Sequence, residues 1–567
     1  MRNHNILILI RFIEILKSLF LSLLFVSKVV AQDYSTPCEP ASIRPETAAA
    51  SEAEVPIEEK TPLNTDQSSG IETPNSDTIR RDVSLSEGQT CEDAIAATNP
   101  EGQDPAEAKS EDHKTRDPML LYDNHGLEVR AHIQAGLNIV GERNLFWNLS
   151  DTFAADAAFN PDTDWLELYA KPGLSFKGIL SNDTSLYGKV STVVSGTLGT
   201  DAYDTGDTGR ILLEEGYLGL RTQTSEGINL DFSVGPRELK LGSGMLISNG
   251  ASNGFERGAL KLGPRKAWEF AASATIAYKD FTSKLFYLNP RELASNNSNT
   301  SLAGIDLRYD RPNQNYIGLT YANILDSNSA YPQAALGGIG APTIIPEARS
   351  GLNVTNLYTR VTPFKGKFAP LFLTLDAAYE WNNRINLSAW AGRVQAGYTF
   401  KNLPLSPTLT YSYQTFSGDD PNTGTLERFD PLFYEGSPSS WATGSKSATV
   451  FINSNVQAHQ LALRLLPSVK DTVTLRYAHI RANQLNSPVQ FGQATRFDFS
   501  NGAGVVSGVN NSHLADDFFL EYNRVLNRNT FWTTGFSVSL PGAGIRATVD
   551  QDTPLWYGWF TNIVVNF

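Results

Sequence analysis

The chain is poor in the residues on which most catalytic and metal sites depend. It has 2 cysteines, 7 histidines and 3 methionines in 567 residues. No cysteine or histidine spacing of the kind that metal sites use is present. The second part of the chain has the histidines His132, His459, His479 and His513. Their spacing from serines and acids does not predict a compact Ser/His/acid catalytic site. We therefore expect no metal, no cofactor and no enzymatic activity.

The two cysteines, Cys38 and Cys91, both precede residue 120. In an oxidising compartment they either pair within one chain or remain free or intermolecular thiols, because nothing around them predicts a fold. The sequence leaves both possibilities open.

Long apolar runs are also missing after residue 31, so no later segment is expected to cross a membrane as a helix. Before that point, Arg2, Arg11 and Lys17 precede an apolar run, Leu19 to Val30, that closes on Ala31. This pattern predicts a secretory signal peptide at residues 1–31, with an uncleaved anchor as the alternative. An exported protein of this kind is either soluble or a β-barrel.

Negative charge is concentrated in one segment. Between Gln32 and Met119 there are 20 acidic and 7 basic residues, a balance of −13 within a total of −14. The segment is rich in Pro, Ser, Thr, Ala and Glu and has few aromatic residues, so it cannot bury enough apolar surface to fold alone. We predict a disordered periplasmic extension at residues 32–119. A solvated tail is favoured over a surface that binds a periplasmic partner.

The rest of the chain, residues 120–567, shows repeated segments in which polar and apolar residues alternate. Such alternation is typical of strands that have one apolar face. Short and long connections alternate between the segments, as in bacterial barrels with short periplasmic turns and longer external loops. We predict an all-β, transmembrane antiparallel barrel of 18 strands, with 16 also tolerable; a soluble propeller or solenoid would need a repeated motif, which is missing. The segments begin near residues 127, 164, 184, 211, 228, 263, 281, 301, 314, 352, 370, 386, 407, 447, 471, 514, 530 and 556.

The last segment, Trp556 to Phe567, shows the alternation clearly and resembles the closing strand of outer-membrane barrels. It should pair with the first segment, near Leu127. We expect one face to meet lipid and the other to face the lumen; the lipid face holds Trp559, Ile563, Val565 and Phe567, and the lumen face holds Asn562 and Asn566.

Arginines fall on the polar face of many segments. An arginine facing lipid at mid-membrane would cost about 2 to 4 kcal/mol, so we place these residues inside the barrel. A ring of guanidinium groups would select anions, whereas pairing with acids on the same face would be purely structural. The predicted pore-lining arginines are Arg130, Arg221, Arg237, Arg265, Arg308, Arg360, Arg393, Arg464 and Arg476, and the predicted pore-lining acids are Glu215, Asp231, Glu269, Asp376 and Glu380.

One acidic loop offers oxygen ligands suited to calcium. Its residues Asp419, Asp420, Asn422 and Glu427 are also those that a Pro-Asn turn uses to bond its own backbone. The turn interpretation is favoured, and we predict no metal site there.

Three stretches resemble the alginate export family of outer-membrane barrels: EEGYLGLRTQ with FSVGPRELKLGSGMLISNG (214–250), GFERGALKLGPRKAWEF (254–270) and YQTFSGDDPNTGTLERFDPLF (413–433). The resemblance implies an eighteen-stranded barrel whose electropositive lumen, narrowed by inward loops, passes an anionic uronate polymer outward. It implies that Arg237 and Arg265 are pore residues, with Arg221 beside them, and that Leu241 to Gly250 folds into the lumen. Two features of this chain fit an anionic substrate less well: the barrel has a net charge of −4, and the acidic extension lies at its periplasmic mouth.

We therefore expect a passive channel for anionic solutes in the bacterial outer membrane. The more specific expectation is that it exports an acidic polysaccharide. The expected partners are that polysaccharide or small anions, outer-membrane lipid and a periplasmic partner bound through residues 32–119, with no nucleic acid. A general or sugar-uptake porin is the alternative. An adhesin that uses loops 325–351 and 417–446 is a third possibility.

Overall fold

The computed structural model describes residues 119–149, 160–203, 206–436, 441–445, 451–489, 496–498, 504–506, 508–548 and 552–567. These residues all belong to one compact unit. The predicted signal peptide, nearly all of the predicted extension, and Cys38 and Cys91 lie outside the described residues. Among the described residues, the helices are too short or too polar to cross a membrane.

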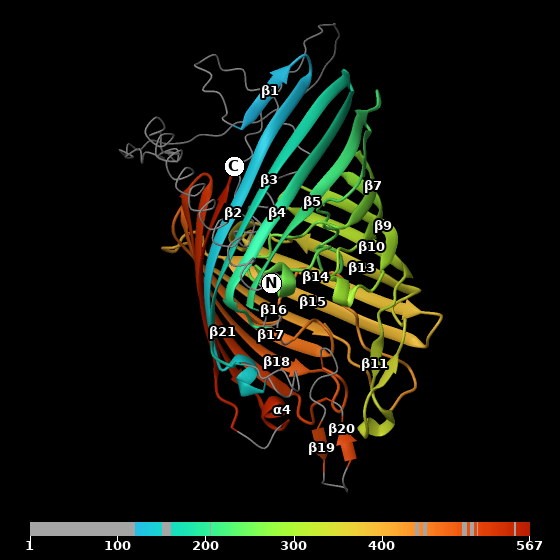
Figure 1. The fold of residues 1–567 in the computed structure, drawn as a ribbon, viewed down its shortest axis with the longest axis vertical. Coiled ribbons are helices and arrows are strands. Elements are labelled where there is room, and N and C mark those ends of the chain that lie inside the picture. The colour runs from blue at the N-terminus through green and yellow to red at the C-terminus, as the bar shows by residue number, and fades with distance from the viewer. Residues whose placement is uncertain are drawn as a thin grey trace, which may run out of the picture. The chain divides into compact units, whose positions relative to one another are not determined.

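The described chain forms a closed antiparallel β-barrel (Figure 1). Its main sheet has 19 strands, of which β1 (Leu120–Asn124) is an addition at one edge and the other 18 form the ring. Each ring strand pairs with its neighbours in chain order. The ring strands are β2 (Leu127–Arg143), β3 (Thr163–Ser181), β4 (Thr184–Thr200), β5 (Gly206–Gln223), β6 (Asn229–Val234), β7 (Phe270–Tyr278), β8 (Phe281–Asn289), β9 (Ser301–Arg311), β10 (Asn315–Asp326), β13 (Leu352–Val361), β14 (Leu371–Asn382), β15 (Leu387–Thr399), β16 (Thr408–Phe416), β17 (Val456–Ser468), β18 (Asp471–Ala482), β21 (His513–Asn527), β22 (Thr530–Pro541) and β23 (Trp556–Asn566).

The ring closes between β2 and β23, as the sequence predicts. Their register runs from the pair Gln134 and Asn566 to the pair Arg143 and Tyr557. The first part of β2 extends beyond β23, and there β1 pairs with it on the same edge, with Leu120 opposite Arg130. The prediction of 18 strands is therefore confirmed, and β1 caps a stretch of β2 that would otherwise present unpaired backbone groups.

The two ends of the barrel differ in their connections. At one end, the short-turn end, connections run from two residues, as at 182–183, to nine at 362–370. The other end, the long-loop end, carries three shorter connections, 201–205, 290–300 and 383–386, and six longer ones, 144–162, 235–269, 327–351, 417–455, 483–512 and 542–555. This asymmetry is typical of barrels whose short turns are periplasmic and whose long loops are external.

Small elements sit within the long connections. Two hairpins are formed by β11 (Tyr331–Gln333) with β12 (Thr343–Ile345) and by β19 (Arg496–Asp498) with β20 (Gly504–Val506). The helical turns are η1 (Leu145–Asn148), η2 (Phe255–Arg257), η3 (Ala294–Asn296), η4 (Leu336–Gly338) and α4 (Ala543–Arg546), and η5 (Gly366–Phe368) lies at the short-turn end.

Alternation along the strands separates the two faces. On β15, Trp390 and Val394 are exposed on the outer face, whereas Arg393 between them is buried inside. On β23, Trp559 is exposed, as predicted for its lipid face, and Val564, which shares the parity of Asn562 and Asn566, is buried. The outer face therefore presents a band of exposed apolar side chains, which is how a barrel surface meets lipid.

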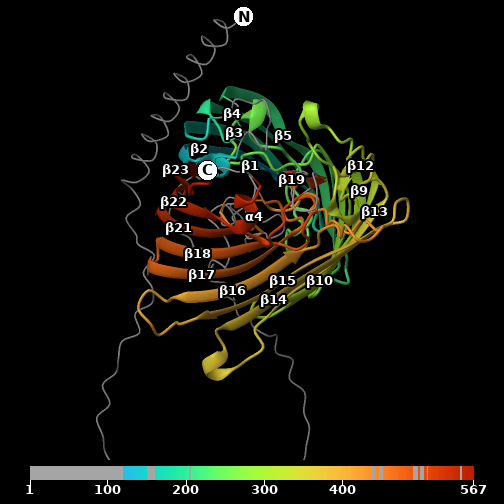
Figure 2. The ribbon, with the colours of Figure 1, turned by 90° about the horizontal axis from the view of Figure 1, so that it is seen from below.

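The apolar core lies inside the barrel, because the long loops fold inward. Trp147 of η1 packs on Trp556 with ring centroids 5.5 Å apart, and Ile545 of α4 is buried in the same cluster. Figure 2 looks onto the long-loop end and shows α4 inside the outline of the ring. Loop side chains thus fill much of the interior toward this end. Besides Trp147, the large buried side chains of these loops include Met245, Ile247, Trp268, Phe429 and Trp441.

Candidate functional site

Six of the predicted arginines remain partly exposed and lie toward the short-turn end. Five are on strands within the closed ring, and Arg130 lies on the part of β2 that extends beyond β23. Each lies within six residues of a connection at the short-turn end. Where an ion pair fixes the side chain, between 31% and 37% of it is exposed. These residues, which we call the arginine vestibule, are Arg130, Arg221, Arg308, Arg360, Arg464 and Arg476.

Aromatic rings support several guanidinium groups of the vestibule. Arg308 lies 4.2 Å from the centroid of Tyr316, and Arg360 lies 4.2 Å from that of Phe372. Attraction between a cation and a ring face contributes about 0.5 to 1 kcal/mol at exposed sites. A stacked guanidinium is held by its face, which fixes the direction in which its edge hydrogen-bonds carboxylates; that of Arg308 bonds Asp310.

Acids pair with part of the vestibule. Arg221 lies 2.9 Å from Asp231, and Arg308 lies 2.9 Å from Asp310. Arg130 forms an ion pair with Glu128, and Arg476 has a longer contact of 3.9 Å with Glu521. Structural pairing, the alternative weighed from the sequence, therefore applies to these four arginines.

Most of the predicted acids are much less accessible than the arginines. Glu380 has no exposed surface, and Asp376 and Glu215 are almost fully buried. Glu215 is neutralised by Lys189 at 2.8 Å. Asp231 keeps some exposure beside Arg221, and Glu269 is exposed just before β7. Among the acids that pair with the vestibule, Glu128, Asp231 and Asp310 are themselves exposed, by 38%, 27% and 49%. The six arginines therefore exceed these accessible partner acids by three.

The buried acids hold the inward loops by accepting backbone N–H groups. Glu167 on β3 accepts hydrogen bonds from the amides of Lys261 and Leu262, at 2.9 and 2.8 Å. Glu214 on β5 accepts bonds from the amides of Lys266 and Ala267, at 2.8 and 2.9 Å. These carboxylates therefore anchor the loop 235–269 to the barrel wall.

A bulge explains why Glu214 and Glu215 both point inward. Opposite β4, the register skips from Glu215 to Leu213, which leaves Glu214 without a cross-strand partner. An extra residue in one strand puts two consecutive side chains on the same face. Strict alternation assigns only one of them to the lumen, so Glu214 is missing from the predicted acids.

The tip of the loop 235–269 crosses the interior. Gly242 and Gly244 adopt positive φ angles of 57° and 80°, a conformation that glycine adopts without strain. The amide of Leu241 donates to the carbonyl of Ile247 at 2.9 Å, which closes residues 242–246 into a compact turn. The prediction of an inward loop with unusual backbone geometry at Leu241 to Gly250 agrees with this conformation.

The far side of the barrel receives this tip. Ser243 hydrogen-bonds Asp376 on β14, and Met245 contacts the side-chain amide of Asn356 on β13 at 3.5 Å. The tip therefore reaches from β6 across to strands that lie much later in the ring. Gly242 of the tip lies against Thr320 and Tyr358. Arg308 is in the same cross-strand row as Tyr358, and Arg360 is one inward position nearer the short turns.

A second inward loop, 417–455, packs against the first. The amide of Ser248 donates to the carbonyl of Phe433 at 2.9 Å, and Lys240 pairs with Glu435 at 2.8 Å. Trp441 lies over Arg393, with the guanidinium 3.6 Å from the ring centroid. Arg393 is thus buried between Trp441 and Asp376, so it belongs to the packing of the loops.

Arg237 and Arg265, the two residues assigned first from the family resemblance, are buried in the same loop. Arg237 stacks on Tyr217 at 4.5 Å and hydrogen-bonds Ser233. Arg265 has no exposed surface and donates to the carbonyls of Ser252 and Gly258 at 3.1 and 2.5 Å. Burial lowers the pKa of each guanidinium to about 10, so both stay protonated at neutral pH. In this conformation they fasten the loop and do not present charge to the lumen.

Arg265→Met should release the loop 235–269 from the wall. The change leaves two buried carbonyls without their charged donor, which costs about 2 to 4 kcal/mol of local stability. Trypsin should then cleave after Lys261 or Lys266 at least about tenfold faster than in the wild type, because 1.4 kcal/mol already corresponds to a factor of ten.

Arg210→Met is the matched control for this measurement. Arg210 contacts the same loop through Glu256 at 2.6 Å, but both side chains are 50% exposed. An exposed pair contributes at most about 1 kcal/mol. Equal cleavage rates in the two variants would contradict the anchoring role of Arg265.

The acidic loop adopts the turn arrangement that the sequence favours. Asp419 accepts hydrogen bonds from the amides of Ala334 and Glu427, at 2.7 and 2.9 Å, and Asp420 accepts one from the amide of Asn422 at 2.9 Å. Burial raises the pKa of the Asp419 carboxyl, and these amides offset part of that rise. The carboxylate oxygens thus bond the backbone of two loops.

Comparison with known proteins gives one family match. Residues 373–555 match the model of the alginate export family, described as "Alginate export". This range includes the predicted stretch 413–433, whereas 214–250 and 254–270 lie outside it. No curated protein matches the chain.

Solved structures of outer-membrane proteins also align with the chain. OccK5 (OpdH) of Pseudomonas aeruginosa is 10% identical, with 77% of this chain and 98% of that chain covered and a TM-score of 0.43. OccAB4 of Acinetobacter baumannii is 11% identical, with the same coverage and a TM-score of 0.42. OmpT of Vibrio cholerae is 10% identical, with 79% and 99% covered and a TM-score of 0.33.

The family match agrees with the stretch 413–433, and the closed ring of 18 strands agrees with the alternation in the sequence. Short turns at one end and inward-folding long loops at the other are features of a channel in the outer membrane. The chain is an outer-membrane β-barrel that matches the alginate export family over residues 373–555.

Proposed function

We propose that the barrel is a passive channel for anionic solutes, and in its sharper form an exporter of an acidic polysaccharide. The observation that carries the proposal is the uneven accessibility of charge on the inner wall. Six arginines remain accessible near the short turns, whereas Glu380, Asp376 and Glu215 are buried. An anion that enters from that end therefore meets more arginines than accessible partner acids, of which there are three: Glu128, Asp231 and Asp310.

The position of the vestibule favours export. Short turns of bacterial barrels face the periplasm, so the arginines lie on the side from which an exported polymer would enter. They are spread over β2, β5, β9, β13, β17 and β18 and thus surround the lumen instead of forming one patch. As a polymer with a carboxylate on each sugar moves, each carboxylate can pass from one arginine to the next. No single site then binds the polymer too tightly, which is what conduction requires.

The stacked arginines suit a uronate in particular. Tyr316 lies between Arg308, at 4.2 Å, and Tyr358, whose ring centroid is 6.0 Å away. Guanidinium groups bind carboxylates in a fork geometry, and Tyr316 is partly exposed whereas Tyr358 is buried. The rings therefore hold the guanidinium group in place, and the carboxylates of a uronate are the groups that it would bind.

Block of single-channel current by oligosaccharides tests the proposal. Oligouronates added on the short-turn side should interrupt current at concentrations at least about tenfold lower than neutral oligosaccharides of equal length, a difference of about 1.4 kcal/mol in binding. Equal block by charged and neutral sugars would favour a general or sugar-uptake porin. A reconstituted barrel without conductance would contradict the channel itself and favour an adhesin.

A further inference from the structure

Three adjacent strands carry a sharp change of polarity on the outer face of the barrel. Along β17, β18 and β21, one cross-strand row is apolar and consists of Leu463, Leu475 and Leu520. The next outward row toward the long-loop end is Leu461, Tyr477 and Phe518, and the row after that is His459, His479 and Asp516. Aromatic residues mark the edge of the apolar band in such barrels, so the last row lies at the exterior water boundary.

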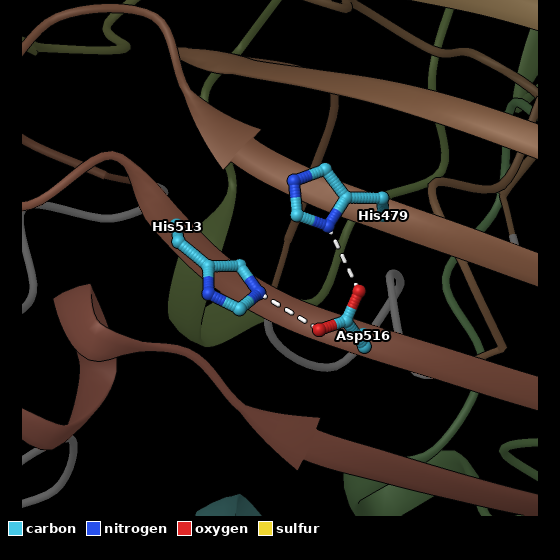
Figure 3. A group of neighbouring side chains, drawn as sticks. All are labelled: His479, His513 and Asp516. Atoms are coloured by element: carbon cyan, nitrogen blue, oxygen red, sulfur yellow. Dashed lines mark hydrogen bonds and ion pairs between the residues drawn. The ribbon is translucent and has the colours of Figure 1, made fainter.

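At this boundary, two histidines converge on one carboxylate (Figure 3). The Nδ1 atom of His479 lies 2.8 Å from Oδ1 of Asp516, and Nε2 of His513 lies 2.9 Å from Oδ2. The two imidazole rings stack, with centroids 4.8 Å apart and planes inclined by 30°. All three side chains are partly exposed, at 25% to 30%.

We propose that His479, His513 and Asp516 bind one divalent transition-metal ion of the Zn²⁺ class. One candidate ligand atom from each residue lies within 4.8 Å of the others. Tetrahedral Zn²⁺ holds nitrogen and oxygen ligands at about 2.0 to 2.2 Å, which places ligand atoms about 3.3 Å apart. Small side-chain rotations bring the three atoms to that spacing without moving the strands.

The chemistry of the ligands selects the class of metal. Imidazole nitrogens suit Zn²⁺, Cu²⁺ and Ni²⁺, whereas Ca²⁺ and Mg²⁺ prefer oxygen ligands alone. A ligating nitrogen carries no proton, so the ion replaces the two hydrogen bonds between the histidines and Asp516. Three protein ligands leave one position that faces outward, open to water or to an anionic group at the membrane surface.

Two neighbouring features support such a site. The hydroxyl of Tyr477 donates to Oδ1 of Asp516 at 2.8 Å, and a hydrogen bond of this kind orients a ligating carboxylate. The ladder between β18 and β21 also shifts register between Ile480 and Arg481, beside the loop 483–512. An ion held by His479 and His513 would therefore join the two strands where their backbone pairing is irregular.

Titration of the full chain in detergent with ZnCl₂, followed by calorimetry, tests the proposal. His479→Asn and His513→Asn should each lower the affinity for Zn²⁺ by at least about 100-fold. Loss of a residue that only supports a ligand costs up to about 100-fold in affinity, and loss of a ligand itself should cost at least as much. Other residues that can bind Zn²⁺, such as His4, His113, Cys38 and Cys91, lie elsewhere in the chain. The readout is therefore the number of ions bound by the wild type minus the number bound by the variant, which should be one.

His459→Asn is the matched control. His459 lies in the same outward row, one strand away, but its Nδ1 atom hydrogen-bonds Tyr411 at 2.8 Å. Its loss should leave Zn²⁺ binding unchanged. Unaltered stoichiometry and affinity in both the His479 and His513 variants would overturn the proposal.

Co²⁺ gives a second, spectroscopic readout. Bound by His479, His513 and Asp516 of the wild-type barrel, it should show the intense visible absorption of tetrahedral Co²⁺, and Zn²⁺ should abolish that absorption. Asp516→Asn, with heat-modifiable electrophoretic mobility as the check of barrel folding, should lack the absorption. A folded variant that retains it would contradict the assignment.

Discussion

Replacing Arg308 and Arg360 together by Gln should reduce the anion-to-cation permeability ratio of the channel at least about fivefold. A unit charge about 8 Å from an ion in water changes its free energy by about 0.5 kcal/mol, and two such charges act on the anion and on the cation in opposite directions. Both arginines lie beside the loop tip and are stacked on rings, so their loss removes cations at a fixed place. Reversal potentials in planar bilayers measure the ratio.

Arg311→Gln is the matched control for this pair. Arg311 lies on the same strand as Arg308, but it is exposed and stacks on Tyr309, with 5.2 Å between the guanidinium and the ring centroid. Odd positions of β9 face outward, so this change removes a charge without altering the lumen. If the double variant keeps the wild-type ratio, the vestibule does not set the selectivity.

Shortening the inward tip should have the second large effect. Residues 242–246 can be replaced by two glycines, because the hydrogen bond from Leu241 to Ile247 already brings the flanking residues together. The tip contacts Asp376 and Asn356 on the far wall, so its removal widens the path. Single-channel conductance should rise about twofold or more, since constrictions limit conduction.

The control replaces η4, Leu336–Gly338, by two glycines in the loop 327–351. Leu336 is 78% exposed, so this shortening leaves the inner wall intact. Unchanged conductance in the tip variant would place residues 242–246 outside the permeation path. An equal rise in both variants would point to a general loosening of the loops.

Much of the barrel could be predicted because alternation and turns are local signals. The predicted start at residue 352 is that of β13, and the predicted start at 471 is that of β18. The two clearest differences are strand starts that follow long loops. The sequence predicts a strand from residue 263, whereas β7 begins at Phe270, and it predicts one from residue 447, whereas β17 begins at Val456. In the first of these stretches, Lys266 and Ala267 are held by Glu214 as part of an inward loop, which no local pattern reveals.

The candidate site could be predicted only in part. Strand parity places Arg308 and Arg360 on the inner face, where the structure also has them. Parity cannot show that an inward residue such as Arg393 is covered by a loop, or that Arg265 lies in a buried loop and not in a strand. The cluster of His479, His513 and Asp516 was missed for a different reason: the long loop 483–512 separates β18 from β21 in the sequence, and only their pairing brings the three residues together.

The reversal potential of the wild-type channel in a salt gradient tests the central claim most directly. If the accessible arginines dominate the inner wall, the potential has the sign of anion preference, and it declines at high ionic strength because exposed charges are screened. A cation-preferring or zero reversal potential at low salt would contradict an anion channel lined by Arg130, Arg221, Arg308, Arg360, Arg464 and Arg476.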